Sequence, residues 1–345
     1  MRRVMAAVVG VLASAAAAAA EPPQYASIGD LALEHGGVIK ECRLEYRTLG
    51  TPNADRSNAV LFPTWFSGRT QDLVQFVGSG QMLDPARHFV ILVGALGNGL
   101  SCSPSISASQ KGAAFPAFTI GDMVNAEKRL VTDVLHITSL EAVVGISMGG
   151  MQAFEWAVRY PGFARHIVPI VGTPKLSPYD ELLWRTELDI IERTLTGACD
   201  AVARARVMSV VGAVHELALS TPKHVNDTLS LDSFDKWFAD KEQSYAADHD
   251  PYDWSAQLRA MLAQDVTLGD RGSIAAAASR VKAPLLAIVA TQDHMVNPSS
   301  AREFVRAAGG TLVELGGECG HLANGCEEAT VTAAVRRFLD GPPNP

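Results

Sequence analysis

The sequence predicts an α/β protein with a mostly parallel sheet, helices on both faces and an inserted helical lid. Two observations predict this class. Short apolar runs typical of buried strands alternate with amphipathic stretches in both halves of the chain. The alternation stops near residue 176 and resumes near residue 270, and the intervening segment is charged and helical in pattern. We therefore expect a core of residues 21–175 and 271–345 and a lid of residues 176–270.

The first twenty residues differ in composition from the rest of the chain. Arg2 and Arg3 precede an uncharged run rich in alanine and valine, and three alanines precede Glu21. This order of charged, apolar and small residues is typical of a cleaved signal peptide. A membrane anchor, the alternative, needs about 20 strongly apolar residues, and an alanine tract is weakly apolar. We expect residues 1–20 to be removed, and the mature protein to be periplasmic or secreted without a stable membrane span.

Composition argues against several kinds of partner. A formal net charge of −8 and the lack of a basic stripe argue against nucleic acid. The five cysteines are too few for a disulfide scaffold and are not spaced like zinc ligands. We therefore expect no metal and no cofactor, although export would allow a disulfide or two to form. The cysteines are Cys42, Cys102, Cys199, Cys319 and Cys326.

The elements of the core are predicted in chain order from the spacing of apolar residues. Residues 31–49 indicate short strands joined by turns, with Gly36-Gly37 between two runs. Short apolar runs predict strands at residues 58–62, 88–93, 140–144, 166–171, 284–290 and 311–315. Apolar residues at helical spacing predict helices at residues 122–135, 151–160, 299–308 and 327–339. Thr119 to Asp122 supply capping residues for the first helix, and Pro161 stops the second.

A Gly-x-Ser-x-Gly pattern lies at residues 145–149, between a predicted strand and a predicted helix. Such a sharp turn holds its serine at the apex, and a side chain at either glycine would collide with neighbouring backbone. The new helix also directs amide N–H groups at the space above the serine, where a negative charge would be stabilised. A chance glycine-serine turn is the alternative. The flanking strand and helix favour Ser147 as a nucleophile.

A serine hydroxyl needs a base, and the base needs an acid that orients it. After a serine in such a turn, the acid precedes the histidine in the chain, and both follow strands of the sheet. Asp293 follows the predicted strand at 284–290, and His321 follows the predicted strand at 311–315. We therefore expect Ser147, Asp293 and His321 to form a catalytic triad.

Other residues are alternatives for the catalytic acid and base. Asp293 could be an ordinary loop carboxylate, and its neighbour His294 is a rival base. His294 precedes the last strand, so its use would leave no acid in the expected order. Asp265 and Asp270 are weaker acid candidates because they precede the strand at 284–290.

The oxyanion that forms during acyl transfer needs two N–H donors. One is expected from Met148, the residue after the nucleophile. The other is expected from the loop after the strand at 58–62, where Phe66 is preferred and Trp65 is the second choice. The aromatic side chains of this loop could also roof the pocket. Both roles are compatible, since an oxyanion donor uses only the backbone.

The run Ser147-Met148-Gly149-Gly150-Met151-Gln152 is more specific than Gly-x-Ser-x-Gly. Together with residues 83–90, 115–124, 145–157 and 320–321, it resembles the homoserine O-acetyltransferase family of α/β-hydrolase-fold proteins. The resemblance extends over most of the mature chain. It implies the same triad, a helical lid, a small acyl substrate and a ping-pong reaction through an acyl-serine. A homodimer is left open.

Two positions depart from the family pattern, and a third corresponds to it. In the transferases, the catalytic histidine is followed by an aspartate that holds the amino group of the substrate, and this chain has Leu322. Gly121 replaces an arginine that is usual in the Thr-Ile-Arg-Asp run. The lid arginine that binds the homoserine carboxylate corresponds to Arg206, with an ordinary exposed helix arginine as the alternative. The resemblance thus implies retained catalytic machinery and weakened amino-acid recognition, with Trp65, Arg206 and Leu322 as candidate substrate contacts.

Three functions follow from these observations. The favoured one is an exported serine hydrolase that cleaves an ester or related acyl compound. An O-acyltransferase with the same triad is the second, and a non-catalytic binding protein, which would have no need of a complete triad, is the third. Export away from acetyl-CoA and the loss of a partner for the homoserine ammonium favour water as the acceptor.

Cys319 and Cys326 flank the candidate base in a short loop. In an oxidising compartment they could form a disulfide that fixes the position of His321. Two free thiols are the alternative, and the sequence leaves both open.

Overall fold

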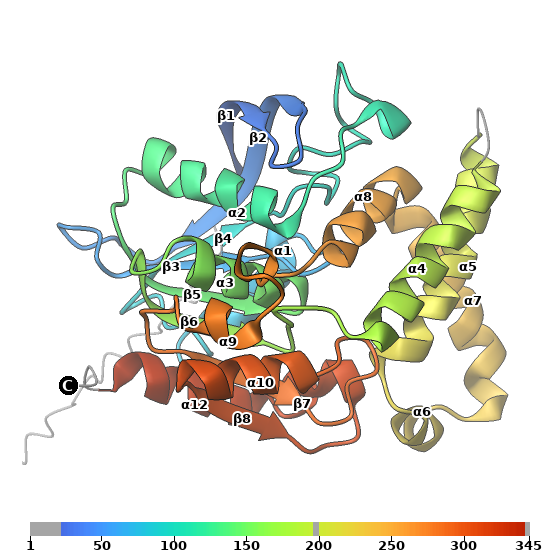
Figure 1. The fold of residues 1–345 in the computed structure, drawn as a ribbon. Coiled ribbons are helices and arrows are strands. Elements are labelled where there is room, and N and C mark those ends of the chain that lie inside the picture. The colour runs from blue at the N-terminus through green and yellow to red at the C-terminus, as the bar shows by residue number, and fades with distance from the viewer. Residues whose placement is uncertain (1–21, 196–199, 342–345) are drawn as a thin grey trace, which may run out of the picture.

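A computed structural model describes residues 22–195 and 200–341, and Figure 1 shows its fold. The predicted signal peptide and Cys199 lie outside these residues. A single sheet has the strand order β1-β2-β4-β3-β5-β6-β7-β8. The strands are β1 (Gln24–Ala32), β2 (Val38–Leu49), β3 (Ala59–Pro63), β4 (Phe89–Val93), β5 (Leu140–Ile146), β6 (Ala164–Ile170), β7 (Leu286–Ala290) and β8 (Thr311–Leu315). Only the pairs β1–β2 and β2–β4 are antiparallel, so the predicted α/β class with a mostly parallel sheet is confirmed.

The first two strands differ from their prediction. The sequence predicts short strands within residues 31–49, whereas β1 and β2 form one long antiparallel pair that begins at Gln24. The register of the pair shifts between Ser27 and Gly29, and again between Gly29 and Leu31. The second shift interrupts the alternation of buried and exposed side chains, which hides the length of β1 from a pattern of period two.

Helices cover both faces of the sheet and bury two apolar clusters. One cluster includes buried side chains of α2 (Ile120–Arg129), α3 (Met148–Arg159), α9 (Ile274–Ala278) and α10 (Ser299–Ala308). The other includes side chains of α1 (Thr70–Leu73) and α12 (Glu328–Asp340). Thr119 caps α2, since its hydroxyl accepts from the N–H of Asp122 and the Asp122 carboxylate accepts from the N–H of Thr119. The predicted helix at 122–135 is divided, because a wider turn at Leu130–Val134 follows α2.

The first five of the α-helices described between β6 and β7 form a group that we refer to as the helical insertion. They are α4 (Pro178–Thr194), α5 (Ala201–Leu219), α6 (Pro222–Thr228), α7 (Leu231–Asp248) and α8 (Pro251–Leu262). In Figure 1, α4, α5 and α7 lie together at one side of the sheet, with α8 between them and the core. Partly buried hydrogen bonds join the insertion to core loops: Asp253 accepts from Ser105, and Thr221 donates to the carbonyl of Glu318.

A disulfide joins Cys42 of β2 to Cys102 in the loop after β4. Their separation of 60 residues gives no local pattern from which the sequence could predict the pair. No helix in the described part of the chain combines the length and apolar character that a membrane span requires.

Glu127 of α2 is completely buried against Trp156 of α3, whose indole N–H donates to Oε2 at 2.7 Å. Burial raises the pKa of Glu127 to about 8, and the bond from Trp156 offsets part of that rise. Between its ordinary pKa of 4.5 and about 8, the folded state therefore holds a proton that the unfolded state releases.

The contribution of this proton to stability is complete below pH 4.5 and is lost as the pH rises through about 8. We expect Glu127→Gln to remove this loss, so that its free energy of unfolding falls less steeply across that window, by about 1.4 kcal/mol per pH unit. Urea unfolding at a series of pH values measures the slope. Glu314→Gln, which alters an exposed glutamate paired with Arg302, is the control. Identical slopes for wild type and Glu127→Gln would contradict the prediction.

Candidate active site

Ser147 lies at the turn between β5 and α3, in a strained backbone conformation with φ of 57°. A Cβ at Gly145 would lie 1.9 Å from the carbonyl oxygen of Gly149. A Cβ at Gly149 would lie 2.7 Å from the carbonyl oxygen of Pro63 in β3. The turn can therefore form only with glycine at both positions, which is the arrangement expected from the sequence pattern. It directs a buried serine toward the loops at the carboxyl ends of the strands.

His321 connects Ser147 to Asp293. Its Nε2 lies 2.8 Å from the hydroxyl oxygen of Ser147, and its Nδ1 lies 2.8 Å from Oδ2 of Asp293. The other carboxylate oxygen of Asp293 accepts from the N–H groups of Met295 and Val296, at 2.9 and 2.8 Å. Serine, histidine and aspartate are all buried. The structure thus brings the three predicted residues into one chain of hydrogen bonds.

The alternative acids are engaged elsewhere. Asp265 forms an ion pair with Lys175 at 2.9 Å, and Asp270 forms one with Arg280 at 2.7 Å. Neither carboxylate is therefore available to orient His321.

Ser147 and His321 open into a cavity of about 290 Å³ that is lined mostly by apolar side chains. Trp65, Phe66 and Leu322, which the sequence singled out, all line it. Leu322 remains 44% exposed, so the side chain after the histidine is accessible to a ligand. The candidate substrate contacts at Trp65 and Leu322 are thus placed beside the serine.

Arg206 is not brought to this cavity. It lies on α5 with an exposed side chain and is not among the residues that line the space around Ser147. The family-based expectation that it contacts substrate is therefore not supported, and the alternative of an exposed helix arginine describes its position. Only the neighbouring turns of α5, which carry His215 and Leu219, line the cavity.

The expected oxyanion donors, Met148 and Phe66, both lie near Ser147 in the fold. Met148 begins α3 directly after Ser147, and Phe66 lines the cavity from the loop after β3. Within the described residues, the backbone N–H of neither donates a hydrogen bond. Both donors expected for an oxyanion are thus uncommitted.

The predicted disulfide between Cys319 and Cys326 is present, and the alternative of two free thiols is wrong. It closes the loop that carries His321. Next to the histidine, Gly320 has φ of 62°, and a Cβ there would lie 3.1 Å from the backbone of Ser220. The loop is thereby held both by the disulfide and by close packing against the end of α5.

Gln257 of α8 is a residue that the sequence analysis missed. Its side chain is completely buried. Its Oε1 accepts from the N–H of Ser67 at 2.7 Å, and its Nε2 donates to the carbonyl of Leu96 at 2.8 Å. The helical insertion therefore fixes the loop that carries Phe66. A single glutamine in a helix has no motif that would have revealed this role.

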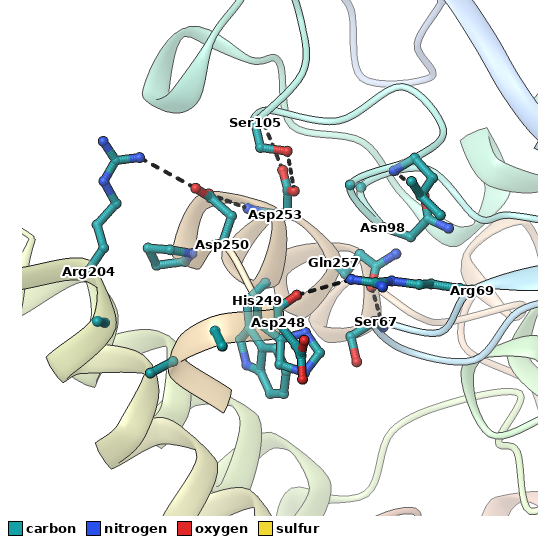
Figure 2. Close-up of a pocket in the computed structure, with 18 of the residues that line it drawn as sticks. Ser67, Arg69, Asn98, Ser105, Arg204, Asp248, His249, Asp250, Asp253 and Gln257 are labelled. Carbon is teal, nitrogen blue, oxygen red and sulfur yellow. Dashed lines mark hydrogen bonds and ion pairs between the residues drawn. The ribbon is translucent and has the colours of Figure 1, made fainter. Parts of the chain in front are cut away.

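Ser67 also lines a second pocket, of about 480 Å³, whose lining combines apolar residues with several charged and polar side chains and which we call the polar pocket (Figure 2). There, Asp253 accepts from the N–H and hydroxyl of Ser105 at 2.8 and 2.5 Å. Burial raises the pKa of Asp253 to about 7, while the bonds from Ser105 act in the opposite direction. Burial lowers the pKa of His249, also in this pocket, to about 4, so its ring is neutral at pH 7. This polar pocket is a neighbour of the catalytic cavity with distinct chemistry.

Comparison with known proteins finds esterases and acyltransferases. A probable esterase from Corynebacterium glutamicum is 46% identical over 174 residues, 50% of this chain and 50% of that protein. An ethyl acetate hydrolase from Pseudomonas veronii is 35% identical over 275 residues, 76% of this chain and 78% of that protein. A homoserine O-acetyltransferase from Caulobacter vibrioides is 40% identical over 148 residues, 38% of each chain. The chain thus spans half the length of the first relative and most of the second.

A solved structure extends the similarity to the whole fold. An acetylester hydrolase from Corynebacterium glutamicum matches with a TM-score of 0.86 and 31% identity, covering 93% of this chain and 96% of that chain. In addition, the family model described as alpha/beta hydrolase fold matches residues 60–325, which include Ser147, Asp293 and His321. The chain therefore belongs to the α/β hydrolase fold family, among relatives that include esterases and homoserine O-acetyltransferases.

Proposed function

We propose that this protein is a serine hydrolase that cleaves a small carboxylic ester through an acyl-serine intermediate. The observation that carries the proposal is the hydrogen-bonded series Ser147, His321 and Asp293 at the wall of a mostly apolar cavity. The relatives named as esterases support the same reaction.

In the proposed reaction, Oγ of Ser147 attacks the carbonyl carbon of the ester while Nε2 of His321 takes the serine proton. Asp293 stabilises the resulting imidazolium through Nδ1. The N–H groups of Met148 and Phe66 bind the oxyanion, and His321 returns its proton to the departing alcohol. Water then attacks the acyl-serine with His321 as base, which releases the acid and restores the serine hydroxyl.

We propose water as the acceptor because of the side chain at position 322. The ammonium of homoserine would need a carboxylate partner in a buried site, and Leu322 supplies none. The loss of about 3 kcal/mol of acceptor recognition corresponds to roughly a hundredfold in rate. An O-acyltransferase is the second candidate, favoured by the homoserine transferases among the relatives.

Purified protein should therefore hydrolyse p-nitrophenyl acetate and ethyl acetate. Added homoserine should not divert the acyl group, so mass spectrometry should detect no O-acetylhomoserine with either ester or acetyl-CoA as donor. Efficient transfer from acetyl-CoA to homoserine would refute the hydrolase proposal in favour of the transferase. The absence of both reactions would refute both enzymatic candidates.

We also propose where the protein acts, how its chain is divided into core and lid, and how a homodimer would form. Residues 1–20 would direct export to the periplasm or medium, and the two disulfides, Cys42–Cys102 and Cys319–Cys326, are suited to an oxidising compartment. Residues 176–270 would act as the lid of a core formed by residues 21–175 and 271–345. For a homodimer, exposed apolar side chains on the helical insertion would supply the contact surface; they include Leu217, Leu231 and Phe234.

Gln257 has an expected effect on this reaction. Gln257→Leu removes the acceptor for the Ser67 N–H and frees the loop that carries the Phe66 donor. We expect kcat to fall by about tenfold to a hundredfold with a smaller change in KM, because a displaced donor weakens binding of the oxyanion more than binding of the ester. Steady-state kinetics with p-nitrophenyl acetate measure both constants.

The control for Gln257 is Gln264→Leu. Gln264 is another buried glutamine of the same segment, and its amide donates to the carbonyl of Pro174. Its replacement should lower stability without a comparable fall in kcat. An equal loss of kcat in both variants would show that Gln257 acts on stability alone.

A further inference from the structure

A second histidine faces the catalytic cavity, and it is held by a buried carboxylate. His215 of α5 lies with its Nδ1 3.0 Å from Oε1 of Glu187 in α4. The other oxygen of Glu187 accepts from the indole N–H of Trp254 in α8, at 3.1 Å. Glu187 is completely buried, and His215 is buried. Three helices of the insertion therefore combine to fix one imidazole ring.

The partner of Nδ1 determines what the ring offers at Nε2. A carboxylate accepts hydrogen bonds, so it holds a proton on Nδ1 of His215, and in the neutral form of the ring Nε2 carries a lone pair. This is the way in which a buried carboxylate sets the tautomer of a histidine that binds a ligand through its other nitrogen. In that form, Nε2 of His215 is an acceptor.

The His215 ring lies at the wall of the cavity that contains the nucleophile candidate. His215 lines the same cavity as Ser147 and His321. Within the described residues, Nε2 of His215 has no hydrogen-bond partner, and it is not one of the fully enclosed polar atoms. Its ring packs against Phe66 and Trp254, with centroid distances of 5.7 and 5.1 Å.

An uncommitted acceptor in apolar surroundings is unfavourable unless something binds to it. An aliphatic or aromatic side chain at position 215 would avoid the free-energy cost of an unpaired acceptor. It would also need no buried glutamate as a hydrogen-bond partner. Two other polar side chains outside the triad, Ser67 and Asn324, line the cavity, but both are less buried than His215. His215 is therefore the polar group best placed to form a hydrogen bond with the part of a substrate that is enclosed next to the serine.

We propose that Nε2 of His215 accepts a hydrogen bond from a hydroxyl group of the substrate, so that the preferred substrates are short esters that carry a hydroxyl. The inference rests on the proposed hydrolase function and adds a substrate class to it. His215 is a specificity residue in this proposal. The bond-making and bond-breaking steps remain with Ser147 and His321.

Matched esters test the preference. The 2-hydroxyethyl, 2-fluoroethyl and propyl acetates differ only in a terminal OH, F or CH3, and ethyl glycolate and ethyl propanoate form the corresponding pair on the acyl side. Wild-type enzyme should favour the hydroxyl compound in at least one series by about tenfold or more in kcat/KM, because the alternatives leave the buried acceptor unpaired. In His215→Phe that ratio should fall to near one, whatever the change in the absolute rates on the two esters.

His249→Phe is the matched control. The His249 ring packs on the same Trp254, at a centroid distance of 4.9 Å, but it lines the polar pocket of Figure 2 rather than the catalytic cavity. This variant should keep the wild-type ratio. No preference for hydroxyl esters in either series, or a ratio that survives in His215→Phe, would overturn the proposal.

A binding measurement on Ser147→Ala separates this inference from the proposed reaction. Long-range ¹H–¹⁵N spectra of the imidazoles report whether Nε2 of His215 is unprotonated and whether its resonance moves when an intact ester binds. The hydroxyl ester should shift it and its methyl counterpart should not. If no ester is hydrolysed, the proposed function fails while these spectra still decide the role of His215. A protonated Nε2, or equal shifts with both esters, would overturn that role.

Discussion

Replacement of Ser147 by alanine is expected to abolish ester hydrolysis, with a fall in kcat of about 10⁴-fold or more. The oxygen that forms the acyl bond is removed, while the oxyanion donors and the cavity remain. The folded structure should be retained, because the Ser147 hydroxyl lies at a cavity wall and its hydrogen bond is with the His321 side chain. A fluorophosphonate probe, followed by intact-mass measurement, should label wild-type protein once and leave Ser147→Ala unlabelled.

Ser209→Ala is the control for this experiment. Ser209 donates to the backbone carbonyls of Ala205 and Glu242 within the helical insertion. Its replacement should leave labelling and turnover unchanged. Labelling of Ser147→Ala at the wild-type rate would show that the reactive group is elsewhere.

Asp293→Asn is expected to lower kcat/KM by about 10³–10⁴-fold with little effect on substrate binding. Oδ1 of Asp293 accepts from two backbone N–H groups, those of Met295 and Val296. An asparagine would keep its oxygen there and direct its NH2 group at His321. The imidazole would then accept at Nδ1 and carry its proton on Nε2, where it could no longer take the proton of Ser147.

The pH–rate profile and thermal unfolding of Asp293→Asn distinguish this effect from loss of structure. Asp265→Asn is the control, since this carboxylate precedes β7 and pairs with Lys175. It should retain activity within a few fold. A loss of less than tenfold in Asp293→Asn would mean that another group orients His321.

The three residues of the proposed triad could be selected from the sequence because their signals are local. The turn at Ser147 tolerates only glycine at positions 145 and 149, so five consecutive residues are enough to predict its geometry. Asp293 and His321 each follow a strand that is recognisable as an apolar run, and the parallel arrangement brings the ends of those strands to one edge. The disulfide between Cys319 and Cys326 could be considered from the sequence for the same reason, since the two cysteines are seven positions apart in the chain.

The contacts of the helical insertion could not be predicted, because a helical pattern indicates which side chains are buried but not which residues they touch. Arg206 and His215 lie on the same helix, yet Arg206 is exposed and His215 lines the cavity. Which of them meets the substrate depends on how α5 packs against α4 and α8. The bond between His215 and Glu187 spans 28 residues, and the bond between Gln257 and Ser67 spans 190.

The sequence by itself therefore determined the fold class and identified Ser147, Asp293 and His321 as the residues of the proposed triad, since each depends on periodicity or on a short run of residues. The tertiary structure alone decided the pairing of Cys42 with Cys102, the support of the oxyanion loop by Gln257 and the second histidine of the cavity. Those features join residues distant in the chain. A buried polar side chain needs a partner, and only the packing of the helices shows which one it has.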